Sequence, residues 1–117
     1  MNVNDVTHIY IVRHGQTDFN KEGKIQGHSN NSPANDINEK GIEEAYALAK
    51  KLEGTVFDYI FSSDLNRAIQ TCKIITKGKE PVTDERMRER NWKKWEGRLM
   101  DEFNNSGTIL APSAMNN

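Results

Sequence analysis

Short runs of apolar residues alternate along the chain with segments in which apolar residues recur every three or four positions. Residues 9–12 (Ile-Tyr-Ile-Val) form a β-branched and aromatic run, which predicts a strand buried on both faces. Residues 56–61 (Val-Phe-Asp-Tyr-Ile-Phe) have the composition of a second strand. Residues 81–83 predict a short third strand.

Two segments carry apolar residues at steps of three and four, the spacing of an amphipathic helix. The first spans residues 39–53, with Asn38 as its N-cap and Gly54 just beyond its end. The second runs from Asp64 to about Lys77, with Ser63 as its N-cap. The predicted buried stripes are Ile42, Ala45, Ala49 and Leu52 in the first helix, and Leu65, Ala68, Ile69, Cys72 and Ile75 in the second.

Residues 18–37 lose this periodicity and are rich in Asn, Gly, Ser and Asp, which predicts a long loop. A loop of this length in a compact domain is usually functional or disordered. Residues 104–117 are polar and predict a disordered tail.

The composition indicates one small soluble domain. The chain has 117 residues, with 16 Lys and Arg against 17 Asp and Glu, so no bulk charge favours a nucleic acid. The single cysteine, Cys72, excludes an internal disulfide and a cysteine-based zinc cluster. No apolar run approaches the ~18–20 residues of a membrane span, and we expect a cytoplasmic protein with no membrane partner.

Candidate chemistry follows the first predicted strand, at Arg13, His14 and Gly15. Open α/β sheets bind ligands at the carboxyl ends of their strands, and Gly15 allows a sharp turn close to a ligand. Arg is a planar clamp for an oxyanion, and His is a candidate nucleophile. The alternative is that His14 only caps the end of the strand.

The second strand-to-helix junction carries another arginine. Residues 62–71 read Ser-Ser-Asp-Leu-Asn-Arg-Ala-Ile-Gln-Thr, which places Arg67 in the first turn of the predicted helix. Free backbone N–H groups and the helix dipole favour an anion there. Arg67 would then complete a clamp on a phosphoryl group, and the alternative is a surface arginine.

These two junctions resemble the signatures of the histidine phosphatase superfamily, whose fold is phosphoglycerate-mutase-like. Residues 86–97 resemble a third family block, in which Glu89 falls on the position of the proton donor and Lys93 replaces the usual Gly. The resemblance covers residues 7–98 and implies an α/β fold with a mostly parallel sheet flanked by helices. We therefore expect residues 1–103 to be a partial, truncated histidine phosphatase domain.

The resemblance also implies the roles of individual residues. His14 would attack phosphorus through one ring nitrogen and form a phosphohistidine, while a backbone acceptor would hold its other nitrogen. Glu89 would protonate the leaving group and then activate water. The substrate phosphate would be bound by Arg13, Arg67, Asn20 and Gln16, although a role in the turn is an equal alternative for Gln16. We expect no metal and no cofactor, because the guanidinium groups supply the positive charge.

The neighbours of Glu89 oppose its expected role. Arg86, Arg88 and Arg90 flank it in the sequence, and close cations would depress its pKa. Alternation along an extended segment would instead turn Glu89 toward the pocket and the arginines away from it.

A second histidine completes the phosphate pocket in this family, and none of His8, His14 and His28 lies at its position. The family strand that carries it also lies between the two main strands expected here. We therefore expect an incomplete sheet whose exposed edges favour self-association.

Three functions are compatible with the sequence. The first is a phosphatase of small phosphorylated metabolites that acts through a phosphohistidine. The second is a phosphoglycerate mutase-type phosphotransferase, and the third is a non-catalytic phosphate-ligand or interaction module that lacks the second histidine. Gln26-Gly27 and residues 62–65 resemble the phosphatase branch more than the mutase branch, which favours hydrolysis.

Overall fold

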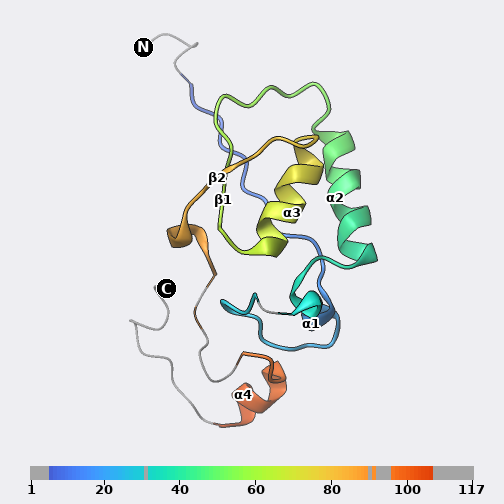
Figure 1. The fold of residues 1–117 in the computed structure, drawn as a ribbon, viewed down its shortest axis with the longest axis vertical. Helices are drawn as coiled ribbons and strands as arrows, with labels where there is room; N and C mark the ends of the chain where they lie inside the picture. Colours follow the sequence, from blue (N-terminus) through green and yellow to red (C-terminus); the bar gives the residue numbers. More distant parts are fainter. Residues whose placement is uncertain (1–5, 31, 90, 92–95, 107–117) are drawn as a thin grey trace.

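The computed structural model describes residues 6–30, 32–89, 91 and 96–106, and Figure 1 shows the arrangement of its helices and strands. In chain order these are α1 (Asp18–Lys21), the 3-10 helix η2 (Pro33–Asn35), α2 (Glu39–Lys51), β1 (Phe61–Ser62), α3 (Asn66–Ile75), β2 (Val82–Thr83), the 3-10 helix η3 (Glu85–Met87) and α4 (Met100–Ser106).

The sheet is small and parallel, and α3 connects its two strands. Phe61 of β1 lies opposite Val82 of β2, and Ser62 lies opposite Thr83. Helices α2 and α3 pack side by side (Figure 1). This arrangement confirms the expected α/β class.

Helix α2 begins and ends close to its predicted bounds because its caps are encoded locally. Asn38 is the N-cap, and its side chain accepts a hydrogen bond from the backbone N–H of Gly41. Gly54 follows the helix with a φ of 86°. The buried positions include Ala45 and Ala49 as predicted, whereas Ile42 is 39% exposed, and that part of the predicted stripe is wrong.

Helix α3 differs from its prediction at its start and on its buried face. It begins at Asn66, and its N-cap is Leu65, which makes no side-chain cap hydrogen bond. The predicted cap was therefore wrong, because the hydroxyl of Ser63 accepts from the N–H of Leu65 ahead of the helix. Leu65, just before the helix, is buried as predicted. The buried residues within α3 are polar, Arg67 and Thr71, since this face of α3 is turned toward the candidate site.

The two main strand predictions were largely wrong. Residues 9–12 lie in no strand, and Ile9 and Ile11 are 78% and 93% exposed. The strand predicted over residues 56–61 overlaps β1 only at Phe61, while Tyr59 is 80% exposed. Composition favours a strand, but ladder hydrogen bonds need a neighbouring strand. Within the described residues, β1 is paired only with β2, and residues 9–12 have no ladder partner.

Residues 18–37 form an ordered connection around the site. Thr17 and Asn20 cap α1 reciprocally through a capping box. Isolated bridges join Thr17 to Ile37 and Lys24 to Leu99. The second bridge places Leu99, just before α4, beside Lys24 of this connection.

The C-terminal expectation is only partly within the described residues. Helix α4 continues to Ser106, so residues 104–106 are helical, and residues 107–117 lie outside the described part of the chain. Among the described residues, no helix is long and apolar enough to cross a membrane.

Candidate active site

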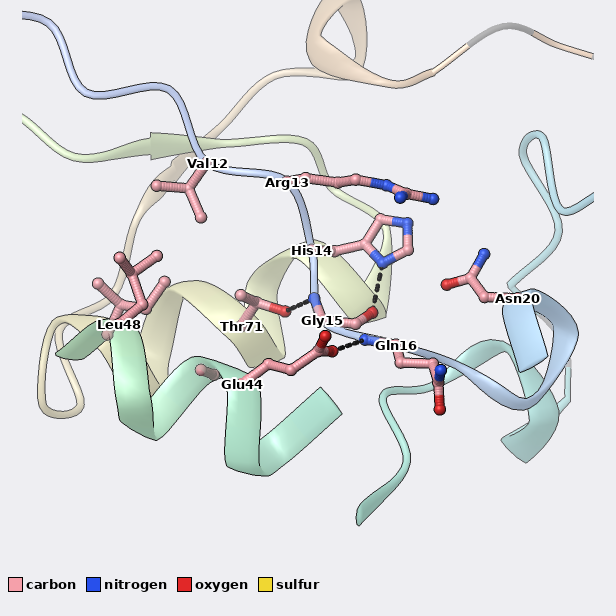
Figure 2. Close-up of a pocket in the computed structure, with 11 residues that line it drawn as sticks. Val12, Arg13, His14, Gly15, Gln16, Asn20, Glu44, Leu48 and Thr71 are labelled. Carbon is pink, nitrogen blue, oxygen red and sulfur yellow. Dashed lines mark hydrogen bonds between the residues drawn. The ribbon is translucent and has the colours of Figure 1, made fainter. Parts of the chain in front are cut away.

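The candidate site lies where the turn after residue 12 passes α2 and α3. Figure 2 shows the residues that line the hollow beside this turn. It has a volume of about 320 Å³, and its walls come from the turn, from α2 and from α3. Its polar side is formed by Arg13, His14 and Asn20, and its apolar side includes Val12 and Leu48. A mostly apolar hollow with a few convergent polar groups is typical of a small-molecule site.

His14 is held by the backbone in one orientation. Its Nδ1 lies 2.6 Å from the carbonyl oxygen of Gly15 (Figure 2). A carbonyl can only accept a hydrogen bond, so Nδ1 carries the proton and Nε2 holds the lone pair. The structure therefore contains the backbone acceptor that the sequence led us to expect beside the candidate nucleophile.

The surroundings of His14 favour its neutral form. Partial burial lowers the pKa of His14 below its ordinary value of 6.5, and the hydrogen bond to Gly15 opposes this effect. The charges of Arg67 and Arg13 lower this pKa further, whereas that of Glu89 raises it. A neutral imidazole is the form that can attack as a nucleophile.

Two helices hold the backbone of the turn. The N–H of Gly15 donates to Thr71 Oγ1 of α3 at 2.9 Å, and the N–H of Gln16 donates to Glu44 Oε1 of α2 at 2.9 Å. A Cβ on Gly15 would lie 2.6 Å from the carbonyl oxygen of Gly41. Glycine is therefore required at position 15 by the close approach of the turn to α2.

Arg67 is buried at the start of α3, with a side chain that is 1% exposed. Its Nη2 donates to the carbonyl of Gly27 at 2.5 Å and to Glu89 Oε1 at 2.6 Å. Its Nη1 donates to the carbonyl of Ser29 at 2.8 Å. The loop that contains Gly27 and Ser29 therefore fixes the guanidinium group against the carboxylate of Glu89.

Glu89 is brought to Arg67 and remains accessible, with a side chain that is 45% exposed. The flanking arginines bind other carboxylates: Arg88 forms a two-fold contact with Asp64, at 2.5 and 2.6 Å. Arg86 pairs with Asp84, and Arg90 lies outside the described residues. The Arg88 guanidinium lowers the pKa of the Asp64 carboxyl.

Arg13 is exposed at the rim of the hollow. Figure 2 shows its guanidinium group on the same side of the turn as the imidazole of His14. Asn20 also lies at this rim, where its Oδ1 accepts from Thr17 N–H at 3.1 Å and its Nδ2 donates to Gln26 Oε1 at 3.0 Å. Both side chains are thus close to the candidate nucleophile.

The side chain of Gln16 is directed elsewhere. Its Oε1 accepts from Nδ2 of Asn38, the N-cap of α2, at 3.2 Å. Figure 2 shows the amide pointing away from His14. Its observed contacts belong to the turn, which was the alternative role considered for this residue.

Several supporting residues were not singled out from the sequence. Thr71 and Glu44 hold the turn, His28 Nε2 donates to the backbone carbonyl of Glu89 at 2.8 Å, and buried Gln26 links Asn20 to Asn35. Their contacts span 6 to 61 positions in sequence, so periodicity could not reveal them. Thr71 lies one helical turn after Arg67 within the second family block, which was the available signal.

A metal site is not indicated in the described part of the chain, where no group of three or more His, Cys, Asp or Glu residues could hold an ion. The positive charge near His14 comes from Arg13 and Arg67. These guanidinium groups are suited to planar, two-point recognition of a phosphoryl group.

Known proteins with related sequences and structures include both mutases and phosphatases. The probable phosphoglycerate mutase GpmB of Yersinia pestis (strain Pestoides F) is 42% identical over 97 residues, which are 81% of this chain and 43% of that protein. The structure of Bacillus stearothermophilus YhfR is 38% identical with a TM-score of 0.69, over 80% of this chain and 46% of that one.

A phosphoserine phosphatase from Entamoeba histolytica, solved in complex with 3-phosphoglyceric acid, is 37% identical with a TM-score of 0.68. That match covers 82% of this chain and 45% of the other. The chain thus spans about half the length of the relatives it matches. The family model of the histidine phosphatase superfamily (branch 1) matches residues 9–109, and the chain belongs to this superfamily.

Proposed function

We propose that this chain provides the nucleophilic half of a phosphatase of small phosphorylated metabolites, with His14 as the phosphoryl acceptor. The observation that carries the proposal is the bond between Nδ1 of His14 and the Gly15 carbonyl. It leaves Nε2 as the nucleophilic nitrogen beside two arginines. This combination supports in-line attack on a phosphomonoester.

The first step transfers the phosphoryl group to the enzyme. Nε2 of His14 forms a bond to phosphorus while the bond between phosphorus and the ester oxygen breaks. The departing alkoxide takes a proton from the carboxyl group of Glu89. Arg13, Arg67 and Asn20 bind the phosphoryl oxygens and stabilise their charge in the transition state.

The second step regenerates the enzyme. Glu89, now a carboxylate, takes a proton from water as the oxygen of that water bonds to phosphorus. The bond between phosphorus and Nε2 breaks, and inorganic phosphate leaves. The same carboxyl group therefore acts first as an acid and then as a base.

The contact between Arg67 and Glu89 supports a link between substrate binding and this acid role. Nη2 of Arg67 donates to Oε1 of Glu89 at 2.6 Å in the structure. A phosphoryl oxygen bound at Nη2 would replace Glu89 as its acceptor. The carboxyl group of Glu89, which is 45% exposed, would then be free to face the oxygen of the leaving group.

A mutase activity is the second candidate, and the GpmB relatives support it. In that reaction a hydroxyl group of the substrate, in place of water, would take the phosphoryl group back from Nε2 of His14 as the bond between phosphorus and nitrogen breaks. The hydrolysis favoured by the sequence and the mutase reaction share the first step and differ only in the acceptor. A module that binds phosphate without turnover is the third candidate.

The test is hydrolysis of a generic aryl phosphate by the purified 117-residue chain without added metal, with His14→Ala as the control. Turnover that disappears in His14→Ala supports the phosphatase. Exchange of phosphate between phosphoglycerates, with little release of inorganic phosphate, would favour the mutase. Binding of vanadate without either reaction would contradict catalysis by this chain and favour the binding module.

A further inference from the structure

One buried hydroxyl group connects the turn that carries His14 to the helix that carries Arg67. Thr71 Oγ1 accepts from the N–H of Gly15 at 2.9 Å and donates to the carbonyl of Arg67 at 2.8 Å. Thr71 is 4% exposed, so both hydrogen bonds are shielded from water. Figure 2 shows the first of them on the opposite side of the turn from the imidazole of His14.

The Gly15 backbone needs such an anchor because its carbonyl orients the imidazole. The same residue receives the Thr71 bond at its N–H and offers its carbonyl to His14 Nδ1. Glycine has the widest conformational freedom of any residue. The Gly15 carbonyl shares a peptide plane with the N–H of Gln16, which Glu44 holds. Because Thr71 holds the N–H of Gly15, the peptide planes on both sides of Gly15 are fixed, and the carbonyl stays directed at Nδ1.

We propose that Thr71 is a positioning residue for His14, whose hydroxyl group fixes the Gly15 backbone and thereby the tautomer of the imidazole. Thr71 does not touch the reacting atoms. The inference rests on the proposed function in one respect, namely that Nε2 of His14 is presented to phosphorus. The backbone effect itself does not depend on turnover.

The chain contains a matched control for this hydroxyl group. Thr76 Oγ1 donates to the carbonyl of Cys72 at 2.8 Å, the same four-residue spacing as the bond from Thr71 to Arg67. Hydroxyl groups commonly make this contact within helices. Thr76 lies at the C-terminal end of α3, and Gly15 bonds only to Thr71 among these two threonines. Thr76→Val therefore removes the common contact without removing the anchor.

The first test uses NMR of the full chain and does not require activity. In Thr71→Val, we expect exchange of the Gly15 amide to rise by at least about tenfold, the equivalent of one lost hydrogen bond. The ring nitrogen shifts of His14 should move from the Nδ1–H tautomer to a mixture. Thr71→Ser should restore both signals, and Thr76→Val should leave both unchanged.

An unchanged Gly15 amide and an unchanged His14 ring in Thr71→Val would overturn the inference. If Thr71→Val does not fold, exchange of the Gly15 amide is compared in the wild-type chain and in Thr71→Ser. Slow exchange of the Gly15 amide in both proteins supports the anchor. Exchange at the rate of an unstructured peptide in the wild-type chain contradicts it.

The second test measures aryl phosphate hydrolysis by the same proteins. We expect Thr71→Val to lower kcat about tenfold with little change in KM, and Thr71→Ser to recover most of the loss. Equal kcat values in the wild type, Thr71→Val and Thr76→Val would reject the positioning role while keeping the phosphatase. A wild-type chain without turnover whose NMR signals respond as expected would reject the phosphatase while keeping the anchor.

Discussion

Nη2 of Arg67 lies 2.6 Å from Oε1 of Glu89, and this ion pair joins the first turn of α3 to the segment that follows η3. The two side chains come from blocks 22 positions apart in the sequence. The cation is buried and the carboxylate is half exposed. Because the Glu89 carboxylate is accessible, an anionic ligand could replace it at Arg67, and the buried guanidinium group would then keep a partner of opposite charge.

The first prediction concerns the stability contributed by Arg67. Arg67→Ala removes its bonds to Gly27, Ser29 and Glu89 and leaves a cavity. We expect it to lower the free energy of unfolding by about 2 kcal/mol, a value kept modest because Glu89 is half exposed. Urea denaturation measures this change.

The matched control for Arg67→Ala is Arg86→Ala. Arg86 also pairs with a carboxylate, Asp84, but its side chain is 86% exposed. We expect no measurable shift of its urea midpoint, because exposed pairs contribute little. Equal shifts in the two variants would show that burial of Arg67 does not determine its contribution.

The second prediction concerns the pH dependence of His14. Its pKa is lowered by burial, so the unfolded chain binds more protons than the folded chain in the range between the lowered value and 6.5. The stability contributed by His14 should therefore fall as the pH drops from above 6.5 through its folded pKa, and it should return when the pH is raised.

An NMR titration of the imidazole measures the pKa of His14 directly, and His14→Asn assigns the signal. We expect a midpoint below 6.5, and a pH dependence of the unfolding free energy that is smaller in His14→Asn. A midpoint above 6.5 would contradict the inferred burial of this side chain.

The third prediction concerns the close approach between the turn and α2. A Cβ on Gly15 would meet the backbone of Gly41 at 2.6 Å, and backbone atoms cannot move aside cheaply. We expect Gly15→Ala to destabilise the fold by about 2–3 kcal/mol. Gly54→Ala is the control, because its φ of 86° costs about 1 kcal/mol of strain while its Cβ meets open space. A smaller loss in Gly15→Ala than in Gly54→Ala would contradict the packing.

The fourth prediction concerns self-association. Residues 9–12 expose apolar side chains and have no ladder partner within the described residues, and Ile11 is 93% exposed. Unpaired, apolar edges promote pairing between chains. We expect sedimentation to show assembly of the chain with itself that increases with concentration, and we expect Ile11→Lys to weaken it.

Tyr46→Lys is the control for Ile11→Lys. Tyr46 is an exposed large side chain, at 62%, but it lies on α2, whose backbone is satisfied within the helix. Tyr46→Lys should leave the assembly unchanged. A chain that remains monomeric at every concentration, or equal weakening by both substitutions, would reject pairing through residues 9–12.

The sequence was most informative where structure is determined locally. Asn38 marked the start of α2 because a cap acts on its own neighbours, and Gly54 lies two residues beyond the C-cap, Leu52. The strand predicted over residues 9–12 does not form, because a strand is stabilised by hydrogen bonds to a neighbouring strand. The amino-acid composition of a segment does not show whether such a neighbour is present. The buried face of α3 also differed, because Arg67 and Thr71 are buried for their polar contacts rather than for apolar packing.

The motifs of the sequence identified the candidate site residues, whose roles stay predictions, and did not identify the residues that hold them in place. The charges of Arg13, Arg67 and Glu89 all act on His14. The acceptors and donors that hold them, including Thr71 and Glu44, depend on contacts between distant segments. Such contacts follow from the packing of α2 and α3 around the turn, which no local pattern encodes.

The most direct measurement of the central claim is detection of the covalent intermediate. The purified chain is mixed with an aryl phosphate, quenched at alkaline pH, and analysed by peptide mass spectrometry beside His14→Ala. The account predicts an acid-labile phosphoryl group on the peptide that contains His14, and none in His14→Ala. A phosphoryl group on another residue, or release of phosphate without any labelled histidine, would contradict His14 as the nucleophile.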